Sequence, residues 1–338
     1  MRAASTGAAA FPPPPLQRLS EKCACALRKG GGALASRGGW YRVTQYSGRE
    51  LRGAEDAGLL SPSGQRRRGL AREKSGMEYA DRSAHFLLPY LGNSAVRRLM
   101  PWGLLLLMLG GSFIKEWSPV PESYMSNKRN LLNIYFVKFA WAWTLFLLLP
   151  FISITHYLLT RNLVVVAQRL STLLAGTAIW YACTGVFLHI EDLTGSCYSS
   201  SNLDVLLKEH PSRLQCQQAH GFWHGFDISG HCFLLSYCVL MIVEEITVMH
   251  SLNTSRNPRL QGIVSILFLA LSVLIFIWVW MFFTTAIYFH NLSQKVFGTL
   301  MGLLAWYGTY RFWYLKPFSP GLPPQRTNLS AQKSNHSL

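Results

Sequence analysis

Three kinds of catalytic motif are absent from this sequence. It contains no G-x-x-x-x-G-K-[ST] phosphate-binding loop, no H-E-x-x-H pair of zinc ligands and no G-x-S-x-G nucleophile elbow. These absences argue against nucleotide-driven transport, zinc-peptidase chemistry and serine-hydrolase chemistry. The seven cysteines also form no C-x-x-C pairs at zinc-ribbon spacing, so we expect no structural zinc site.

Charged residues are scarce, at 14% of the chain, and acidic residues are the scarcer kind: 16 Asp and Glu face 32 Lys and Arg, a net charge of +16. Residues 1–99 alone hold 17 of the basic and 7 of the acidic residues. No aromatic residues are interleaved with the basic ones as in a nucleic-acid-binding module, so we predict no nucleic-acid partner. A basic flank before the first apolar segment is instead typical of the cytosolic side of a membrane protein.

Long apolar segments dominate the remainder, and half of all residues are hydrophobic. A helix needs roughly 20 residues to cross about 30 Å of hydrocarbon, and several segments approach that length. Lys115 and two glycines shorten the first segment. We therefore predict an all-α integral membrane protein with six transmembrane helices, near residues 100–114, 132–154, 170–190, 229–248, 262–288 and 296–314.

The chain divides into three parts by composition. Residues 1–76 are rich in Arg, Gly, Ala and Pro and lack sustained apolar periodicity, so we predict a disordered basic extension. Its residues do not follow the order of a cleaved signal peptide. Residues 77–315 form the predicted membrane domain, and residues 316–338 form a cytosolic tail.

Six crossings from a cytosolic N-terminus return the C-terminus to the cytosol. This topology places residues 115–131, 191–221 and 289–295 together on the lumenal side. Cys197 and Cys216 bracket the second of these loops, where an oxidising compartment would permit a disulfide. The pairing is left open by the sequence.

Two features inside the apolar segments have a structural interpretation. The spacing Gly298-x-x-x-Gly302 brings two small residues to one helical face, which favours close packing against another helix. Glu244 and Glu245 lie near the cytosolic end of the fourth segment, where snorkelling to the membrane surface or pairing with another helix is a better interpretation than catalysis.

Polar side chains cluster where the second lumenal loop enters the fourth segment, from Gly221 to His231. Ionisable groups at a membrane boundary are costly to desolvate, so such a cluster indicates a site. The structural alternative is a polar helix start in which Asp227 or Ser229 caps free N–H groups.

A second cluster, Tyr288 to Lys295, lies at the lumenal end of the fifth segment and contains His290. The predicted topology brings His290 to the same face as His231. Two imidazoles can share phosphoryl transfer, one attacking phosphorus and the other protonating the leaving oxygen. Lys295 could then offset charge on the phosphoryl oxygens.

A metal site is the competing hypothesis for the first cluster. His224, Asp227 and His231 would share one stripe of a continuous helix. Gly225 and Gly230 weaken a regular helix there, and the pattern matches no known metal signature, so we predict no metal.

Six stretches of the chain match a known family: Pro119–Tyr124, Ser126–Asn130, Phe136–Trp143, Gly221–His231, Tyr288–Gly298 and Pro317–Pro324. Through them the chain resembles the fat storage-inducing transmembrane family, a relative of the lipid phosphate phosphatases. The resemblance runs from about residue 77 to the C-terminus, and we interpret residues 1–76 as an extension of the kind an upstream translation start adds.

The resemblance implies an endoplasmic reticulum membrane protein that supports lipid droplet formation and membrane lipid balance. It implies cleavage of acyl-CoA to acyl 4′-phosphopantetheine and adenosine 3′,5′-bisphosphate without a cofactor, with His231 as the leaving-group acid and His290 as the nucleophile. The cation motif of the wider phosphatases is not recognisable here, which leaves Lys128, Arg129 and Lys295 as candidates. The acid behind the nucleophile is also missing from its usual place.

Asp227 or Glu191 are the candidates to replace that acid, and Ser229 is a further supporting residue. The alternative function, from a different class, is a non-catalytic protein that binds diacylglycerol or triacylglycerol between its helices and promotes droplet budding. The expected partners are thus acyl-CoA, these neutral lipids and the membrane lipids, and the sequence identifies no protein partner.

Overall fold

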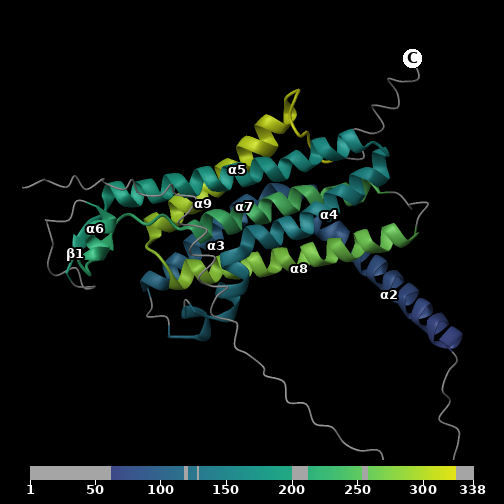
Figure 1. The fold of residues 1–338 in the computed structure, drawn as a ribbon, viewed down its shortest axis with the longest axis horizontal. Coiled ribbons are helices and arrows are strands. Elements are labelled where there is room, and N and C mark those ends of the chain that lie inside the picture. Colours follow the sequence, from purple (N-terminus) through teal and green to yellow (C-terminus); the bar gives the residue numbers. More distant parts are fainter. Residues whose placement is uncertain (1–61, 118–120, 128, 200–211, 253–257, 325–338) are drawn as a thin grey trace, which may run out of the picture. The chain divides into compact units, whose positions relative to one another are not determined.

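A computed structural model of the protein describes residues 62–117, 121–127, 129–199, 212–252 and 258–324 (Figure 1). The α-helices are α2 (Pro62–Leu91), α3 (Ser94–Trp117), α4 (Ala140–Thr160), α5 (Leu163–Thr194), α6 (Arg213–Gln218), α7 (Gly230–Glu245), α8 (Pro258–Tyr288) and α9 (Leu292–Trp306). Two short strands, β1 (Ser196–Tyr198) and β2 (Phe222–His224), pair antiparallel. Short π and 3₁₀ segments are η1 (Tyr124–Ser126), η2 (Leu132–Phe136), η3 (Val137–Phe139), η4 (Ile246–Ser251), η5 (Tyr307–Phe312) and η6 (Trp313–Leu315).

The described residues confirm an all-α membrane architecture. Five helical segments are long and apolar enough to cross a bilayer, namely Ser94–Trp117, Leu132–Thr160, Leu163–Thr194, Gly230–Ser251 and Arg259–Tyr288. Each contains most or all of one predicted span and extends beyond it. The sixth predicted span is helical as well, but only its first part, α9, is α-helical, and η5 and η6 continue it to Leu315. A sixth crossing therefore stays a prediction.

Helix α7 occupies the centre of the bundle. Every residue from Cys232 to Glu245 is buried, and α3, α4, α5, α8 and α9 all contact this helix. Figure 1 shows α4, α5, α7 and α8 running lengthwise beside one another. A helix that is apolar around its whole circumference belongs inside a bundle, which explains this position.

The two ends of the bundle differ in composition. At one end α3, α5 and α8 terminate and α4, α7 and α9 begin, and we call it the site end. Lys115 of α3 bonds to the carbonyl of His290, and Ser123 bonds to the Tyr288 hydroxyl. The Thr194 hydroxyl accepts a bond from the Phe226 amide. The first and third of the loops that the predicted topology placed on one face are thus in contact.

The opposite end, which we call the anchor end, carries a buried carboxylate on α7. Glu245 accepts two hydrogen bonds of 2.8 Å from the Arg169 guanidinium of α5 and one of 2.6 Å from the Tyr310 hydroxyl of η5. The guanidinium also bonds to the carbonyls of Pro320 and Gly321. Because a buried charge is tolerated only when paired and hydrogen-bonded, these contacts fix α5 and the segment after η6 to α7.

The neighbouring carboxylate ties α3 to α7 and adds a second tie to η5. Glu244 is 2% exposed and pairs with Arg97 of α3 at 3.3 Å and with Arg311 of η5 at 2.7 Å. Both glutamates therefore connect helices, in agreement with the structural interpretation of the sequence.

Helix α2 was not predicted. We expected disorder over residues 1–76, but the chain is helical from Pro62, while residues 1–61 lie outside the described part. Residues 65–74 are rich in Arg, Ala, Leu, Glu and Lys, which are good helix formers. The buried stripe Ala80, Ala84 and Leu88 follows helical spacing, and α2 packs against α8. The helix has charges of both signs and only a narrow apolar face, so it does not appear as an apolar segment of the sequence.

The start of the predicted cytosolic tail is also packed. Gln168 bonds to the carbonyl of Ser319 at 2.8 Å, and Ser251 bonds to the carbonyl of Pro324 at 2.8 Å. Residues 316–324 thus lie against the anchor end, and residues 325–338 lie outside the described part.

The Gly298-x-x-x-Gly302 spacing serves the contact between α9 and α7. A Cβ atom on Gly298 would overlap the carbonyl oxygen of Ser229, and one on Gly302 would overlap the Ser236 hydroxyl. The absence of side chains therefore allows the two backbones to approach closely, as the spacing predicts.

We expect Glu245→Ala to lower the free energy of unfolding by about 3–5 kcal/mol, because it leaves the Arg169 guanidinium buried without its carboxylate. Thermal or denaturant unfolding in detergent measures this loss. Glu78→Ala, at an exposed glutamate of α2, is the matched control and should match wild type. Equal stability of Glu245→Ala and wild type would show that the cluster is not an anchor.

We expect Gly298→Ala to destabilise the protein by about 1–3 kcal/mol, since the added methyl group meets backbone rather than open space. Gly110→Ala in α3 is the control, because a Cβ there has nothing within 4 Å. Unfolding of both variants in the same detergent tests the contact, which an unchanged Gly298→Ala would contradict.

Candidate active site

The first candidate histidine lies at the N-terminus of α7. Ser229 is the N-cap: its hydroxyl accepts the Cys232 amide at 3.3 Å, and the residue is fully buried. His231 follows as the second helical residue and is partly exposed. Of the two capping alternatives, Ser229 and not Asp227 thus fills that role. The amide end of a buried 16-residue helix favours negative charge beside His231.

The second candidate histidine lies in the sharp reversal between α8 and α9. His290 has a φ of +54°, a left-handed conformation common just after a helix end. Asn291 then caps α9, and its amide bonds to the Gln294 side chain at 3.0 Å in a capping box. The chain turns from one helix into the next within three residues, which leaves little freedom for the backbone of His290.

A backbone contact joins these two places. The Ser229 amide donates to the carbonyl of Gln294 at 3.1 Å, and Gly298 lies directly against Ser229. The segment that carries His231 and the segment that carries His290 are therefore packed on each other at the site end. The two histidines are 59 positions apart in the sequence, but the elements that carry them are in direct contact.

Asp227 is the acid beside the second histidine. Its carboxylate oxygen lies 3.8 Å from His290 Nδ1, and the aspartate side chain is 61% exposed whereas the histidine is 18% exposed. A carboxylate at Nδ1 orients an imidazole and stabilises its protonated form. Glu191, the other candidate, lies in the last turn of α5 and instead pairs with Arg213 of α6 at 2.9 Å.

Two lysines hold the reversal between α8 and α9. Lys295 is 1% exposed, and its ammonium donates to the carbonyl of Ala286 at 2.7 Å. Lys115, in the last turn of α3, donates to the carbonyl of His290 at 2.6 Å. Both cations complement the carbonyl end of α8, where the backbone dipole is negative.

Sequence analysis missed Lys115 and treated it only as a residue that shortens the first span. Its one signal was a cation at the end of an apolar segment on the predicted face of His290. Of the other predicted cations, Arg129 is exposed, and its amide bonds to Asn127 in the loop after η1. Lys128 lies outside the described residues.

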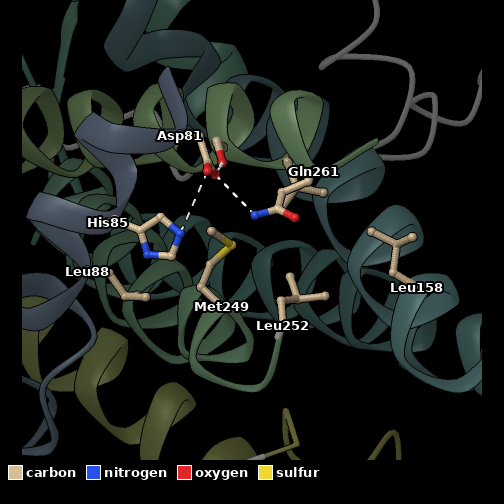
Figure 2. A pocket seen from close by; sticks show the side chains of 9 residues that line it. Asp81, His85, Leu88, Leu158, Met249, Leu252 and Gln261 are labelled. Atoms are coloured by element: carbon tan, nitrogen blue, oxygen red, sulfur yellow. Dashed lines mark hydrogen bonds and ion pairs between the residues drawn. The ribbon is translucent and has the colours of Figure 1, made fainter. Parts of the chain in front are cut away.

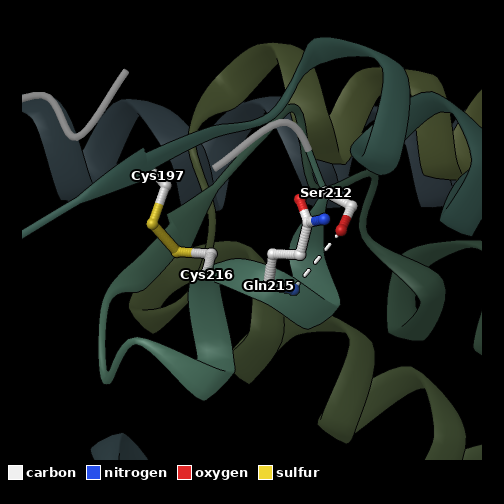
Figure 3. The surroundings of a disulfide bond; sticks show 4 residues. All are labelled: Cys197, Ser212, Gln215 and Cys216. Carbon is white, nitrogen blue, oxygen red and sulfur yellow. Dashed lines mark hydrogen bonds between the residues drawn. A yellow bond between two sulfur atoms is a disulfide. The ribbon is translucent and has the colours of Figure 1, made fainter. Parts of the chain in front are cut away.

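A small subdomain covers part of the site end. Cys197 and Cys216 form a disulfide, which joins β1 to α6, and the Ser212 hydroxyl caps α6 at the Gln215 amide (Figure 3). The pairing of β1 with β2 places Cys197 opposite Trp223. This disulfide closes the loop that sequence analysis identified and fixes the segment leading to Asp227.

The competing metal hypothesis required His224, Asp227 and His231 to lie on one continuous helix, and the described residues 224–231 form no such helix. His224 lies in β2, Asp227 lies in the irregular segment after it, and His231 lies in α7. Within the described residues, no group of three His, Cys, Asp or Glu side chains is placed to hold a metal ion.

A pocket lies elsewhere, between α2, α4, η4 and α8 at the anchor end (Figure 2). Asp81 accepts a bond of 2.8 Å from the Ser265 hydroxyl, and His85 lies 3.8 Å from the same carboxylate. Leu88, Leu158 and other apolar side chains form the rest of its wall. None of the predicted site residues lines this pocket, so it is separate from the two histidines.

Comparison with known proteins gives consistent matches. The family described as "Fat storage-inducing transmembrane protein" matches residues 121–267 and 253–310. Relatives named "Acyl-coenzyme A diphosphatase FITM2" from Bos taurus and Homo sapiens are 60% and 59% identical over 260 residues, 77% of this chain and 99% of each relative. "Fat storage-inducing transmembrane protein 1" from Homo sapiens is 37% identical over 238 residues, 69% of this chain and 79% of the relative.

No solved structure matches the chain. The family match covers more than half of the sequence, and the relatives named above align over two thirds or more of it. This chain therefore belongs to the fat storage-inducing transmembrane protein family.

Proposed function

We propose that this protein is a fatty acyl-CoA diphosphatase. The observation that carries the proposal is the meeting of the His231 and His290 segments, with Asp227 beside His290, at one end of an otherwise apolar bundle. The names of relatives that are 52–60% identical support the same activity. The reaction hydrolyses acyl-CoA to acyl 4′-phosphopantetheine and adenosine 3′,5′-bisphosphate.

The proposed reaction has two steps. His290 attacks one phosphorus of the diphosphate through Nε2, because Nδ1 faces Asp227. The bond from that phosphorus to the bridging oxygen breaks, and His231 gives a proton to the departing oxygen. Water then attacks the phosphohistidine, the P–N bond breaks and His231 takes the proton from water. The sum of the steps is hydrolysis, and both histidines return to their starting state.

The acyl chain supplies binding energy away from the chemistry. Transfer of a chain into an apolar environment contributes about 0.8 kcal/mol per CH₂, so a long chain held among the helices favours long-chain substrates. The headgroup then extends to the site end, where the polar side chains are. This division of the substrate suits an active site built at the edge of a membrane domain.

The proposed location is the endoplasmic reticulum membrane, with both termini cytosolic and the histidines facing the lumen. The basic flank before α3 supports the orientation of the N-terminus. A disulfide at the site end fits an oxidising compartment. The proposed cellular role is support of lipid droplet formation and lipid balance, in contact with diacylglycerol and triacylglycerol.

We expect His231→Ala and His290→Ala each to reduce activity by at least about 100-fold, since each removes a group that acts in the reaction. The assay is release of adenosine 3′,5′-bisphosphate from oleoyl-CoA by purified protein in excess EDTA. His189→Ala, at an exposed histidine in the last turns of α5, is the matched control and should keep full activity.

Well-folded wild-type protein that releases no product from several acyl-CoA lengths would contradict the proposal. That outcome would favour the non-catalytic neutral-lipid binder, in which the histidines are only polar residues at the membrane edge. Droplet formation that survives both histidine substitutions would point the same way.

We expect Asp227→Asn to lower kcat by about 10-fold, because it removes the negative charge that faces Nδ1 of His290, and a loss of about 1.4 kcal/mol of stabilisation is a tenfold change in rate. KM should change little if the carboxylate acts through His290. Asp192→Asn, an exposed aspartate in α5 at the same end, is the control. A wild-type kcat in Asp227→Asn would show that the carboxylate does not orient the nucleophile.

A further inference from the structure

The proposed substrate carries a diphosphate, and the predicted site contains no assigned cation to bind it. Lys128 lies outside the described residues, and the backbone contact of exposed Arg129 is with its own loop. Lys295 and Lys115 remain, and both bond to backbone near His290. Their surroundings decide which of the two can also meet a ligand.

Lys295 is committed to the interior. Its side chain is 1% exposed, and its ammonium donates to the carbonyl of Ala286, four residues before His290 along the chain. Since a ligand would have to enter the packing between α8 and α9 to reach it, Lys295 stabilises the reversal from inside. It is a structural residue in this geometry.

Lys115 has a different environment. It lies in the last turn of α3, is only partly buried, and donates to the carbonyl of His290 at 2.6 Å. An ammonium group has three N–H donors, and this bond uses one of them. The positive charge of Lys115 therefore lies against the backbone of His290, the residue whose imidazole attacks phosphorus.

The neighbouring groups also favour an anion at this position. The amide end of α7, with its cap Ser229, packs on the start of α9, so its positive dipole is directed to the same end of the bundle. Asp227 is the acidic group paired with His290, and Glu116 beside Lys115 is exposed to solvent. A lysine ammonium and a helix N-terminus are a recurrent combination for phosphate groups.

We propose that Lys115 is the diphosphate-binding cation of the site. Its bond to the His290 carbonyl fixes the position of the bound phosphate relative to the nucleophile. This inference rests on the proposed acyl-CoA diphosphatase function and names the residue that contacts the substrate's phosphate oxygens. Charge on those oxygens increases as the bond to the bridging oxygen breaks, so a cation there lowers the barrier as well as binding the ground state.

The test compares Lys115→Gln, Lys115→Met and Lys115→Arg. Glutamine keeps an N–H donor for the His290 carbonyl but no charge, methionine keeps neither, and arginine keeps both. Lys138→Gln, at an exposed lysine in η3, is the matched control. The readouts are kcat and KM with oleoyl-CoA, inhibition by inorganic pyrophosphate, and the rise in thermal unfolding temperature that pyrophosphate causes.

We expect both uncharged variants to lose about 100- to 1,000-fold in kcat, the range found on removal of one group that stabilises developing charge. Pyrophosphate should also inhibit them and stabilise them against heat far less than wild type. Lys115→Arg should keep most of the pyrophosphate effect, and Lys138→Gln should match wild type. Two uncharged variants ensure that poor folding of one does not decide the outcome.

Wild-type kinetics and pyrophosphate inhibition in folded Lys115→Gln would overturn the inference and leave the diphosphatase proposal intact. An inactive wild type that pyrophosphate nevertheless stabilises through Lys115 would overturn the diphosphatase proposal alone. An inactive wild type with no response to pyrophosphate would overturn both.

Discussion

The pairing of two buried carboxylates is the constraint on which the arrangement of the bundle depends. Glu244 and Glu245 lie at the end of the buried stretch of α7, and charges in such a place must be matched by cations and hydrogen bonds. Arg97, Arg169 and Arg311 supply the match from three different parts of the chain. The position of α7 along its own axis is therefore fixed at one end. Its 16 residues span about 24 Å, so the same anchor determines where its N-terminus and His231 lie at the other end.

At the site end, by contrast, close backbone contacts hold α7 and α9 together. Glycines in α9 admit the α7 backbone, and the Ser229 amide closes a bond to Gln294. Lysines on α3 and α9 donate to the carbonyl of His290 in the turn and to that of Ala286 in the last turn of α8. A catalytic pair needs its groups held within a fraction of an ångström, and elements joined in this way supply that accuracy better than a free loop does.

The sequence predicts the parts of this structure that depend on local composition. The apolar segments predict the transmembrane helices because a helix that crosses hydrocarbon must be long and of low polarity. Since successive helices cross in opposite directions, the same segments predict that His231 and His290 lie at one end of the bundle. Helix α2 could not be found in that way, since its burial is a narrow stripe of Ala80, Ala84 and Leu88 in a charged sequence. The contact of Lys115 with His290 depends on the end of α3 meeting the end of α8, and no spacing within the chain encodes that meeting. The alternative that put His224, Asp227 and His231 on one helical face is wrong, because His224 lies in a strand and His231 in a helix.

The order of residues along the chain gives the buried pairs a meaning for biogenesis. Arg97 and Arg169 belong to α3 and α5, which are synthesised before α7, whereas Arg311 and Tyr310 come after it. By the time α7 is synthesised, the arginine that pairs with each of its two glutamates is already part of the chain. Both carboxylates of α7 can therefore be paired with a cation as soon as the helix enters the membrane. Segment η5 then adds Tyr310 to the Glu245 cluster and Arg311 to the Glu244 cluster. The charges of the central helix are therefore matched first by segments made before it and then by segments made after it.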